Sequence, residues 1–308
     1  MLLYRYLSSS MGRPSDGRAV TIGAYDGIHL GHRAILTELK RQAQAAGLPT
    51  AVLSFEPMPR EFFSPANPPA RLTRFREKFE VLSGLGVDEL LCPHFSAIRD
   101  LSPEAFIRGL LVEGLNVRKI VVGHDFRFAA GRVGSTDDLE RAGQTYGFDV
   151  TAVPPVYWRD KRISSTDIRL ALQAGDLETA RGMLGRYYSM SGRVVRGLGL
   201  GRELGFPTAN VSLNRRQTPV DGIFAARVIG LPGGPLDGVA SVGTRPTVGG
   251  DKPLLEVHIF DFSRDIYGEY ITVEFIERLR EERKYSDLDS MVAQMHKDAS
   301  AARAALAA

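Results

Sequence analysis

The chain has 308 residues, which is more than a single hydrophobic core usually serves, so we expect two domains. Its composition is 44% hydrophobic and 24% charged, as in an ordinary globular protein, and no apolar run reaches the roughly 18 residues that span a bilayer. The formal net charge is +3 without a dense basic run, so the sequence does not indicate a nucleic-acid-binding surface.

The single cysteine, Cys92, limits the chemistry that thiols can provide. One thiol can form neither an internal disulfide framework nor a cysteine metal site. The N-terminal residues also lack the apolar core of a signal peptide. We therefore expect a protein of a reducing compartment, the cytoplasm, without a membrane partner.

Strand and helix patterns alternate through the first half of the sequence. Short apolar runs indicate buried strands, and the segments between them have apolar residues at helical spacing, which indicates helices. In chain order the expected elements are strand Ala19 to Tyr25, helix His32 to Ala46, strand Thr50 to Phe55, a helix through Phe75 and Leu82, a helix starting at Ser102, strand Lys119 to Val122, a helix starting at Ser135, strand Asp149 to Val153, and helices Thr166 to Ala174 and Leu177 to Leu184. This alternation predicts an α/β fold with a doubly wound parallel sheet.

The pattern changes after Gly185, where glycines become dense and Asp-Gly turn signals appear at Asp221 and Asp237. Short strands between the turns predict an antiparallel barrel or sandwich. They are Arg193 to Val195, Ile223 to Ile229, Val239 to Val242, Leu254 to Phe262 and Tyr270 to Phe275, with a terminal helix from Ser286 to Ala307. We therefore expect domains at residues 1–185 and 186–308.

The segment from Gly23 to His32 follows a predicted strand and begins a predicted helix. Ligands of open parallel sheets bind at the carboxyl ends of strands, and free N–H groups at a helix start attract phosphate. His29 and His32 are three residues apart, so both imidazoles can lie beside the first turn and donate hydrogen bonds to a phosphate oxygen. A surface turn with two incidental histidines is the alternative, but the strand–turn–helix context favours a functional site.

The string Gly-x-Tyr-Asp-Gly-x-His-x-Gly-His resembles the FMN adenylyltransferase half of bacterial bifunctional riboflavin kinase/FAD synthetases. Its His-x-Gly-His core is the signature of a nucleotidyltransferase superfamily that includes the class I aminoacyl-tRNA synthetases. Three further segments resemble the same family in the same order: Phe55 to Pro59, Val122 to Phe128 and Ile163 to Arg169. The resemblance implies a Rossmann-like nucleotidyltransferase domain that transfers the adenylyl group of ATP to FMN.

The resemblance also implies roles for individual residues. His29 and His32 would stabilise the pentavalent phosphorus. The ATP phosphates would lie against Gly23, Asp26, Gly31, Ser164, Ser165, Thr166 and Arg169, and the flavin against Asp125, Phe126 and Phe128. The alternative for the two phenylalanines is a place in the hydrophobic core, where aromatic residues beside a strand are more often found. The alternative for Ser165 and Thr166 is an N-terminal cap of a helix. Met58 stands where many members have histidine, so this chain has no third histidine at that position.

A second motif runs from Gly201 to Asn210, where glycine-rich backbone can wrap phosphates. It contains no Gly-x4-Gly-Lys-Ser/Thr string, so phosphoryl transfer here would need a different scaffold. Thr208 and Asn210 are two residues apart, and in an extended segment their oxygens share one face and could help hold Mg²⁺. From the residues alone, a glycine-rich turn into a strand is the simpler interpretation.

Gly-Phe-Pro-Thr-Ala-Asn resembles the riboflavin kinase signature, and the segment Leu255 to Phe262 resembles a later one. This resemblance implies a small Greek-key β-barrel with a terminal helix and a Mg²⁺–ATP site at Thr208 and Asn210. Gly201, Arg202 and Gly205 would lie near the phosphates. Glu256 would be the general base that takes the proton of the ribityl hydroxyl, since an alcohol is a poor nucleophile without one. The alternative for Glu256 is an outward-facing strand residue.

The two resemblances together predict an enzyme of FAD biosynthesis. Its C-terminal domain would phosphorylate riboflavin to FMN with ATP, and its N-terminal domain would adenylylate FMN to FAD. Retention of only one activity, or a non-catalytic flavin- or nucleotide-binding regulator, are the alternatives. The expected partners are the small molecules ATP, riboflavin and FMN, with no nucleic acid, and the oligomeric state stays open.

Overall fold

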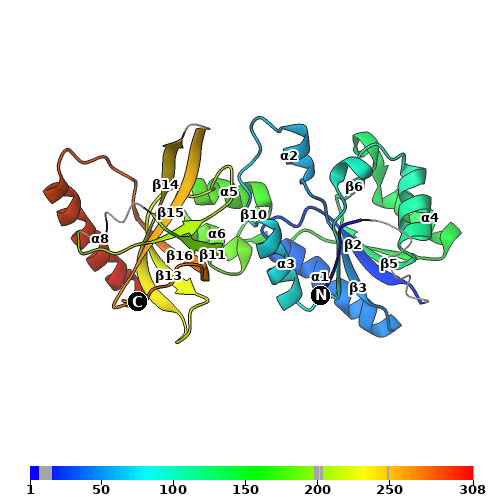
Figure 1. Cartoon of the computed structure of the whole chain (residues 1–308). Coiled ribbons are helices and arrows are strands. Elements are labelled where there is room, and N and C mark those ends of the chain that lie inside the picture. The colour runs from blue at the N-terminus through cyan, green and yellow to red at the C-terminus, as the bar shows by residue number, and fades with distance from the viewer. Residues whose placement is uncertain (7–15, 198–200, 202–203, 248–249, 308) are drawn as a thin grey trace. The chain divides into compact units, whose positions relative to one another are not determined.

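A computed structural model describes residues 1–6, 16–197, 201, 204–247 and 250–307. The chain forms two compact units, Met1–Pro69 with Thr73–Ser164, and Ala70–Leu72 with Ser165–Ala308 (Figure 1). Helices α5 (Ser165–Gln173) and α6 (Leu177–Leu184) belong to the second unit. The domain boundary near residue 185 stays a prediction. In the described part of the chain, no helix combines the length and apolar character that crossing a membrane requires.

The first unit is built on a six-stranded sheet in which every neighbouring pair is parallel. In spatial order its strands are β1 (Leu2–Tyr4), β4 (Glu89–Leu91), β3 (Thr50–Leu53), β2 (Arg18–Ile22), β5 (Val117–Gly123) and β8 (Asp149–Val153). From β2 the chain proceeds outward through β3 to β4, then crosses to the other side of β2 to form β5 and β8. The carboxyl ends of β2 and β5 therefore flank the topological switch point, where open sheets bind ligands.

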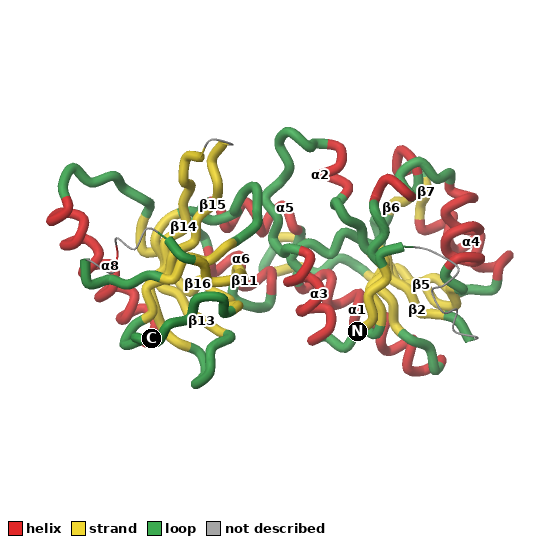
Figure 2. The backbone as a smooth tube through the Cα atoms, in the orientation of Figure 1, coloured by secondary structure: helices red, strands yellow, loops and turns green. Residues whose placement is uncertain are grey.

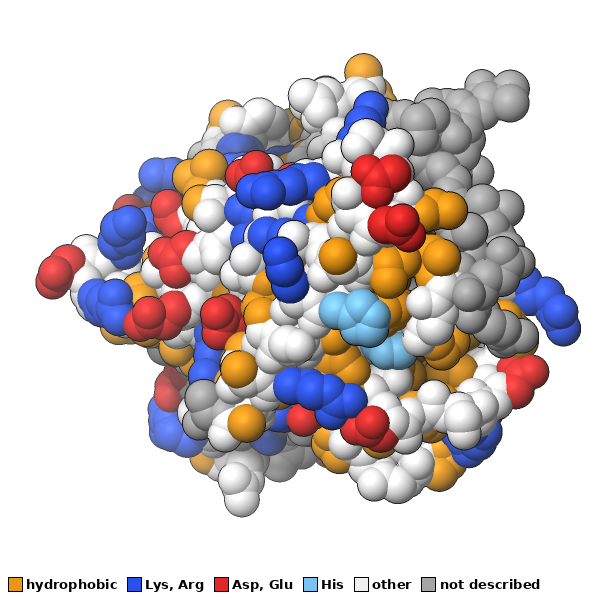
Figure 3. Space-filling model, turned by 90° about the vertical axis from the view of Figure 1, so that its left-hand side faces the viewer, with side chains coloured by type: hydrophobic (Ala, Val, Ile, Leu, Met, Phe, Trp, Pro, Cys, Tyr) orange, Lys and Arg blue, Asp and Glu red, His pale blue; other side chains and the backbone are white. Residues whose placement is uncertain are grey.

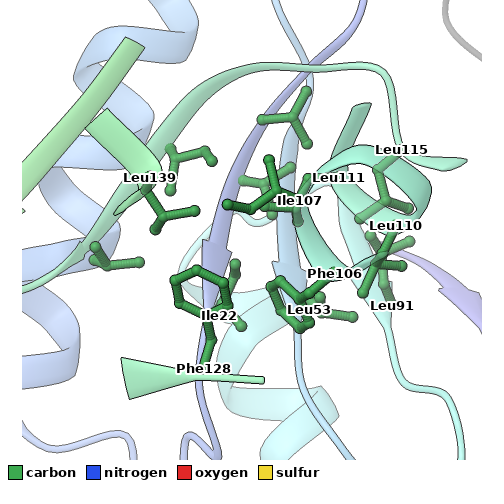
Figure 4. Packing of buried hydrophobic residues seen from close by; sticks show 14 of the residues in the cluster. Ile22, Leu53, Leu91, Phe106, Ile107, Leu110, Leu111, Leu115, Phe128 and Leu139 are labelled. Atoms are coloured by element: carbon green, nitrogen blue, oxygen red, sulfur yellow. The ribbon is translucent and has the colours of Figure 1, made fainter. Parts of the chain in front are cut away.

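Helices cover both faces of this sheet, because alternate strand residues face opposite sides. On one face, Ala19 packs with α1 (Leu30–Ala46) and α3 (Phe75–Gly84). On the other, η2 (Ala105–Gly114), a π-helical segment, and α4 (Thr136–Tyr146) cover Ile22 and Leu53 (Figure 4). The doubly wound sheet is thus confirmed. Shorter elements are α2 (Pro59–Phe63), η1 (Phe95–Ala97), β6 (Arg127–Phe128), η3 (Ala130–Arg132), β7 (Gly134–Ser135), β9 (Tyr157–Trp158) and β10 (Lys161–Arg162).

The second unit contains a closed antiparallel barrel and a long terminal helix (Figure 2). Around the barrel the strands are β11 (Tyr188–Val195), β12 (Ala209–Ser212), β15 (Gly250–Ile259), β14 (Leu236–Thr247), β13 (Gly222–Ile229) and β16 (Tyr270–Arg280). Strands β13, β14 and β15 are consecutive neighbours, and β16 returns beside β13, which is Greek-key topology. Helix α8 (Leu288–Ala307) packs on β13, β14 and β16, where Ala302 is buried with Ala225 and Phe260.

Three expected strands end earlier than the apolar runs suggest, and one of them is β3, which ends at Leu53 and not at Phe55. Strand β2 ends at Ile22 because Tyr25 has a φ of 50°, a left-handed conformation that a strand cannot contain. Strand β15 ends at Ile259, ahead of Asp261 with a φ of 52°. The early ends of β2 and β15 follow from backbone conformations that hydrophobicity does not report.

Candidate active sites

The loop from Gly23 to Ile28, here called the signature loop, joins β2 to α1. Tyr25, Gly27 and Ile28 have φ angles of 50°, 85° and 42°, so two non-glycine residues hold left-handed conformations. Such conformations persist only where surrounding contacts enforce them. The Tyr25 side chain is buried and its hydroxyl lies 2.7 Å from Thr21 Oγ1. A Cβ at Gly23 would lie 3.2 Å from the Tyr25 ring, so the small residue makes room for that ring.

Asp26 fixes the middle of the signature loop from within. Its carboxylate is buried and accepts a hydrogen bond of 2.9 Å from the backbone N–H of Thr73. The Thr73 hydroxyl in turn accepts one of 3.0 Å from the Gly27 N–H. These contacts hold the loop, while contact between Asp26 and an ATP phosphate stays a prediction.

The two signature histidines lie together at the start of α1 and form, with the signature loop, what we call the histidine site. Their rings stack with centroids 3.7 Å apart and an interplanar angle of 15°. His29 is the N-cap of α1, and its Nδ1 accepts a 3.3 Å hydrogen bond from the His32 N–H. A Cβ at Gly31 would lie 3.2 Å from the His29 ring, so the glycine lets this ring sit close to the backbone. The Tyr25 ring supports His32 from 4.7 Å.

His32 is held in its neutral form. Burial lowers its pKa well below the ordinary value, and the neighbouring His29 and the Lys78 ammonium lower it further. Its Nδ1 atom is buried and has no hydrogen-bond partner among the described residues. A buried polar atom without a partner is costly unless a ligand or water satisfies it. The histidine site therefore suits a ligand that brings polar or anionic atoms to the helix start.

The predicted flavin residues follow β5, across the switch point from the signature loop. Asp125 accepts a 2.6 Å hydrogen bond from Arg162 Nη2 in β10, a residue that the sequence analysis missed. Partial burial raises the pKa of Asp125, but the hydrogen bond and charge of Arg162 lower it overall. Only the folded chain brings together this pair, because 37 positions separate the two residues.

Phe126 and Phe128 lie in different surroundings. Phe128 is buried, and its ring centroid is 4.9 Å from that of Phe106 and 5.9 Å from that of Phe126. Phe126 is partly exposed at the edge of the same cluster. Phe128 is therefore part of the core, and flavin contact stays a prediction for both rings. Met58, the residue at a position often occupied by histidine, is buried at the start of α2.

The third predicted phosphate segment begins α5. Ser164 ends the first compact unit, whereas Ser165, Thr166 and Arg169 belong to the second. Arg169 donates hydrogen bonds of 2.6 Å to the Ala70 carbonyl and 3.0 Å to the Ser165 carbonyl. The guanidinium thus holds the segment Ala70–Leu72 against α5, and phosphate contacts for these residues stay predictions.

Strand register in the barrel aligns the predicted kinase residues. Asn210 in β12 pairs with Glu256 in β15, and Glu256 pairs with Ser241 in β14. Cross-strand partners share one face of a sheet. The flanking residues Leu255 and Val257 are completely buried, so Glu256 points away from the barrel interior. We call the face with Asn210, Glu256 and Ser241 the barrel site.

The loop before β12 brings Thr208 to the barrel site. The Phe206 N–H donates a 2.7 Å hydrogen bond to the Gly201 carbonyl, which closes the loop. A Cβ at Gly201 would collide with the Phe206 carbonyl and lie 3.4 Å from Thr208 Oγ1. Gly205 has a φ of 81°, which also favours glycine. Arg202 lies outside the described residues.

Histidines hold this loop from two elements. The Phe206 ring centroid lies 5.2 Å from that of His258 in β15 and 4.8 Å from that of His296 in α8. His258 Nδ1 lies 2.9 Å from the Pro207 carbonyl oxygen. On the face drawn in Figure 3, histidine side chains lie together at the surface among hydrophobic and basic ones. The terminal helix is therefore connected directly to the loop that carries Thr208.

Comparison with known proteins assigns both halves of the chain. The model described as FAD synthetase matches residues 13–167, and that described as riboflavin kinase matches residues 184–306. The bifunctional riboflavin kinase/FMN adenylyltransferase of Escherichia coli strain K12 is 45% identical over 98% of this chain and 97% of its own. This chain belongs to the bifunctional riboflavin kinase/FMN adenylyltransferase family. It is an enzyme that carries both transferase domains of FAD biosynthesis.

Two further relatives support the family and the fold. The member from Pseudomonas fluorescens is 44% identical over 94% of this chain and 93% of its own. A crystal structure titled macrolide-efflux protein, from Streptococcus pneumoniae, superposes with a TM-score of 0.81 at 30% identity, covering 97% of each chain. That likeness confirms the arrangement of a parallel-sheet domain followed by a barrel with a terminal helix, and the efflux title belongs to the other protein.

Both families use ATP as a substrate, typically with a divalent metal ion. The barrel site fits such an ion: the hydroxyl of Thr208 and the amide oxygen of Asn210 are hard oxygen donors, and Glu256 is beside them in register. A Cβ at Gly197 would collide with the Asn210 amide, so glycine backbone lies close to this donor. Among the described residues no group of three or more His, Cys, Asp or Glu could hold a metal ion.

Proposed function

We propose that this chain makes FAD from riboflavin in two ATP-dependent reactions at separate sites. The barrel site phosphorylates riboflavin to FMN, and the histidine site transfers the adenylyl group of a second ATP to FMN, releasing pyrophosphate. The domain boundary lies near residue 185, between α6 and β11. The observation that carries the proposal is that the central residues of each signature come together: the His29–His32 stack at the switch point, and the Asn210–Glu256 pair across two strands.

Adenylyl transfer requires charge stabilisation and alignment more than a base, because the FMN phosphate is already an anionic nucleophile. His29 accepts the His32 N–H at Nδ1, so a neutral His29 ring carries its proton on Nε2 and can donate it to a phosphate oxygen. The N-terminus of the 17-residue helix α1 adds backbone donors and a positive dipole end. His29 and His32 then stabilise the charge that develops on the α-phosphate.

The remaining predicted residues hold the two substrates of this reaction. Ser164, Ser165, Thr166 and Arg169 bind the phosphates that leave as pyrophosphate, since hydroxyl and guanidinium groups donate to phosphate oxygens. Asp125, Phe126 and Phe128 contact the flavin. The backbone at Gly23 and Gly31 approaches the nucleotide. Asp26, whose carboxylate accepts a hydrogen bond from the Thr73 N–H, lies beside the ATP phosphates.

Riboflavin phosphorylation requires a base, because the ribityl hydroxyl is a weak nucleophile. Glu256 takes the hydroxyl proton as the oxygen attacks the γ-phosphorus. Thr208 and Asn210 hold Mg²⁺, which when bound offsets the charge of the phosphates. Gly201, Arg202 and Gly205 lie along the ATP phosphates, where backbone N–H groups donate to them.

The test is a timed incubation of the purified chain with riboflavin, ATP and Mg²⁺, followed by chromatographic separation of the flavins. FMN followed by FAD supports both sites. Accumulation of FMN without FAD would overturn the assignment of the histidine site, and conversion of supplied FMN but not riboflavin would overturn that of the barrel site. A parallel incubation without Mg²⁺ measures the contribution of the metal to each step.

A further inference from the structure

A lysine side chain is completely buried beside the signature loop. Lys78 extends from α3, and its exposed fraction is zero. An ammonium group out of water is stable only when it is paired and hydrogen-bonded. Lys78 Nζ donates hydrogen bonds of 2.8 Å to the Ala24 carbonyl and 3.1 Å to Ser54 Oγ, and it lies 3.9 Å from Glu56 Oε1.

These contacts converge on one peptide of the signature loop. The Ala24 carbonyl accepts from Lys78 and also from the Ser54 hydroxyl, at 3.1 Å. Ser54 directly follows β3, the neighbour of β2 in the sheet, so the carbonyl is tied to the rigid part of the fold. The chain then turns at Tyr25 into its left-handed conformation. Lys78 thus fixes the point at which the backbone leaves the strand.

A short series of contacts leads from this peptide to the imidazoles. Tyr25 follows Ala24 in sequence, and its buried ring lies 4.7 Å from the His32 ring. His32 stacks on His29 at 3.7 Å. A shift of the Ala24 peptide would therefore move the Tyr25 ring and, with it, the histidine stack.

The charge of the buried ammonium also affects the protonation of His32. Burial is the main cause of the lowered pKa of His32, and the Lys78 charge adds to it. The Glu56 carboxylate, 3.9 Å away and partly exposed to solvent, is a counter-charge to this buried cation.

We propose that Lys78 is a positioning residue for adenylyl transfer, which holds the Ala24 carbonyl so that the signature loop presents His29 and His32 in their reactive arrangement. This inference rests on the proposed function of the histidine site. Lys78 acts through the loop and does not itself touch the reacting atoms. Its loss should therefore lower the rate of the chemical step more than it weakens substrate binding.

The experiment compares Lys78→Met with the wild type and with Arg18→Met. Methionine keeps a long side chain and removes the charge and the donors. Arg18 is the matched control, because it is equally buried and pairs with Glu89 at 2.5 Å, yet it begins β2 at the end opposite the signature loop. With FMN supplied, Lys78→Met should lower kcat for FAD formation roughly 10- to 100-fold, with small changes in KM. Riboflavin kinase activity should be unchanged, and Arg18→Met should lower thermal stability without this loss of kcat.

A spectroscopic measurement separates positioning from simple destabilisation. In Lys78→Met, NMR titration of the imidazole signals should show the pKa of His32 moving up toward its ordinary value, whereas Arg18→Met should leave it in place. Unchanged kcat, or an equal loss of kcat in Arg18→Met, would overturn the inference.

If circular dichroism shows that Lys78→Met does not fold, the positioning role is tested with Ser54→Ala instead. This smaller change removes one of the two donors to the Ala24 carbonyl, so kcat should fall roughly 3- to 10-fold. A Ser54→Ala chain with wild-type kcat would overturn the inference. A wild-type chain that makes no FAD would instead overturn the proposed function, so the two failures are distinguishable.

Discussion

The histidine site gathers its donors in one loop and one helix start, whereas the barrel site spreads its polar groups over the outer face of three strands. His29 is 7% exposed, and His32 is partly buried beside it. Glu256 is partly exposed, and only strand register places it between Asn210 and Ser241. The histidines of the first site are close in sequence, whereas the groups of the second are brought together by the pairing of distant strands.

The difference corresponds to the chemistry of each reaction. An anionic phosphate nucleophile needs donors that are already in place and need no proton transfer, and a water-excluded loop makes such donors effective. An alcohol nucleophile needs a charged base, which is less costly to keep near solvent. The two nucleophiles thus account for donors at a helix start in one site and a partly exposed carboxylate in the other.

The largest effect that would test this comparison is the loss of the base in the barrel site. Glu256→Gln keeps the shape and removes the proton acceptor, so riboflavin phosphorylation should fall roughly 10²- to 10⁴-fold. FAD formation from supplied FMN should be unchanged, and flavin chromatography measures both. The control is Glu274→Gln, another partly buried carboxylate on a barrel strand, in β16. Equal losses in the two variants would mean that Glu256 serves the barrel fold and not the reaction.

Much of the architecture could be predicted from the sequence because it follows from local patterns. Strand Asp149–Val153 and helix Leu177–Leu184 have the predicted bounds, and α4 begins where expected, with Ser135 as its N-cap. The strands β1 (Leu2–Tyr4) and β4 (Glu89–Leu91) were missed, since three residues are too few to show an alternation. Parallel pairing with distant strands, not local hydrophobicity, makes them part of the sheet.

The residues of the candidate sites also differ in whether a local sequence pattern reveals them. His29 and His32 could be found because they lie within a single ten-residue motif. Lys78 could not, since it meets Ala24 across 54 positions and looks in the sequence like any helical lysine. Its burial is the only signal, and burial is set by the packing of α3 against the sheet.

The next largest effect concerns the histidine site. His29→Ala removes a donor and the N-cap of α1, so FAD formation from FMN should fall roughly 10²- to 10³-fold while riboflavin phosphorylation continues. FMN should then accumulate in the incubation with riboflavin. His94→Ala is the control, because His94 also caps a short helical turn in the first unit but is exposed. A His29→Ala chain that still makes FAD at the wild-type rate would remove the chemical basis of the comparison.

A smaller effect should distinguish the metal dependence of the two sites. Asn210→Ala removes one proposed metal ligand, so the kinase should need roughly tenfold more Mg²⁺ for half-maximal rate, as expected for one lost bond to a charged partner. The Mg²⁺ dependence of FAD formation from FMN should not change. Ser212→Ala, two residues further along β12, is the control. An unchanged Mg²⁺ requirement in Asn210→Ala would place the metal elsewhere.

The smallest effect is in the pH dependence of the histidine site. Because the pKa of His32 lies well below 6.5 in the folded chain, His32 stays neutral there at pH values where the unfolded chain already binds a proton. The unfolded state then holds more protons, so this group lowers the free energy of unfolding as pH falls below about 6.5, by at most about 1.4 kcal/mol per pH unit. Above that pH its contribution is constant.

The rate of FAD formation should accordingly show no loss from His32 protonation between about pH 8 and pH 6, the range in which an ordinary histidine titrates. Urea unfolding of the wild type and of His32→Asn, each at several pH values, measures the contribution of His32 to the free energy of unfolding. Only the wild type carries an imidazole with a lowered pKa at this position. Parallel pH slopes for the two chains would show that His32 titrates normally. The neutral state assigned to His32, on which its role in the histidine site depends, would then be wrong.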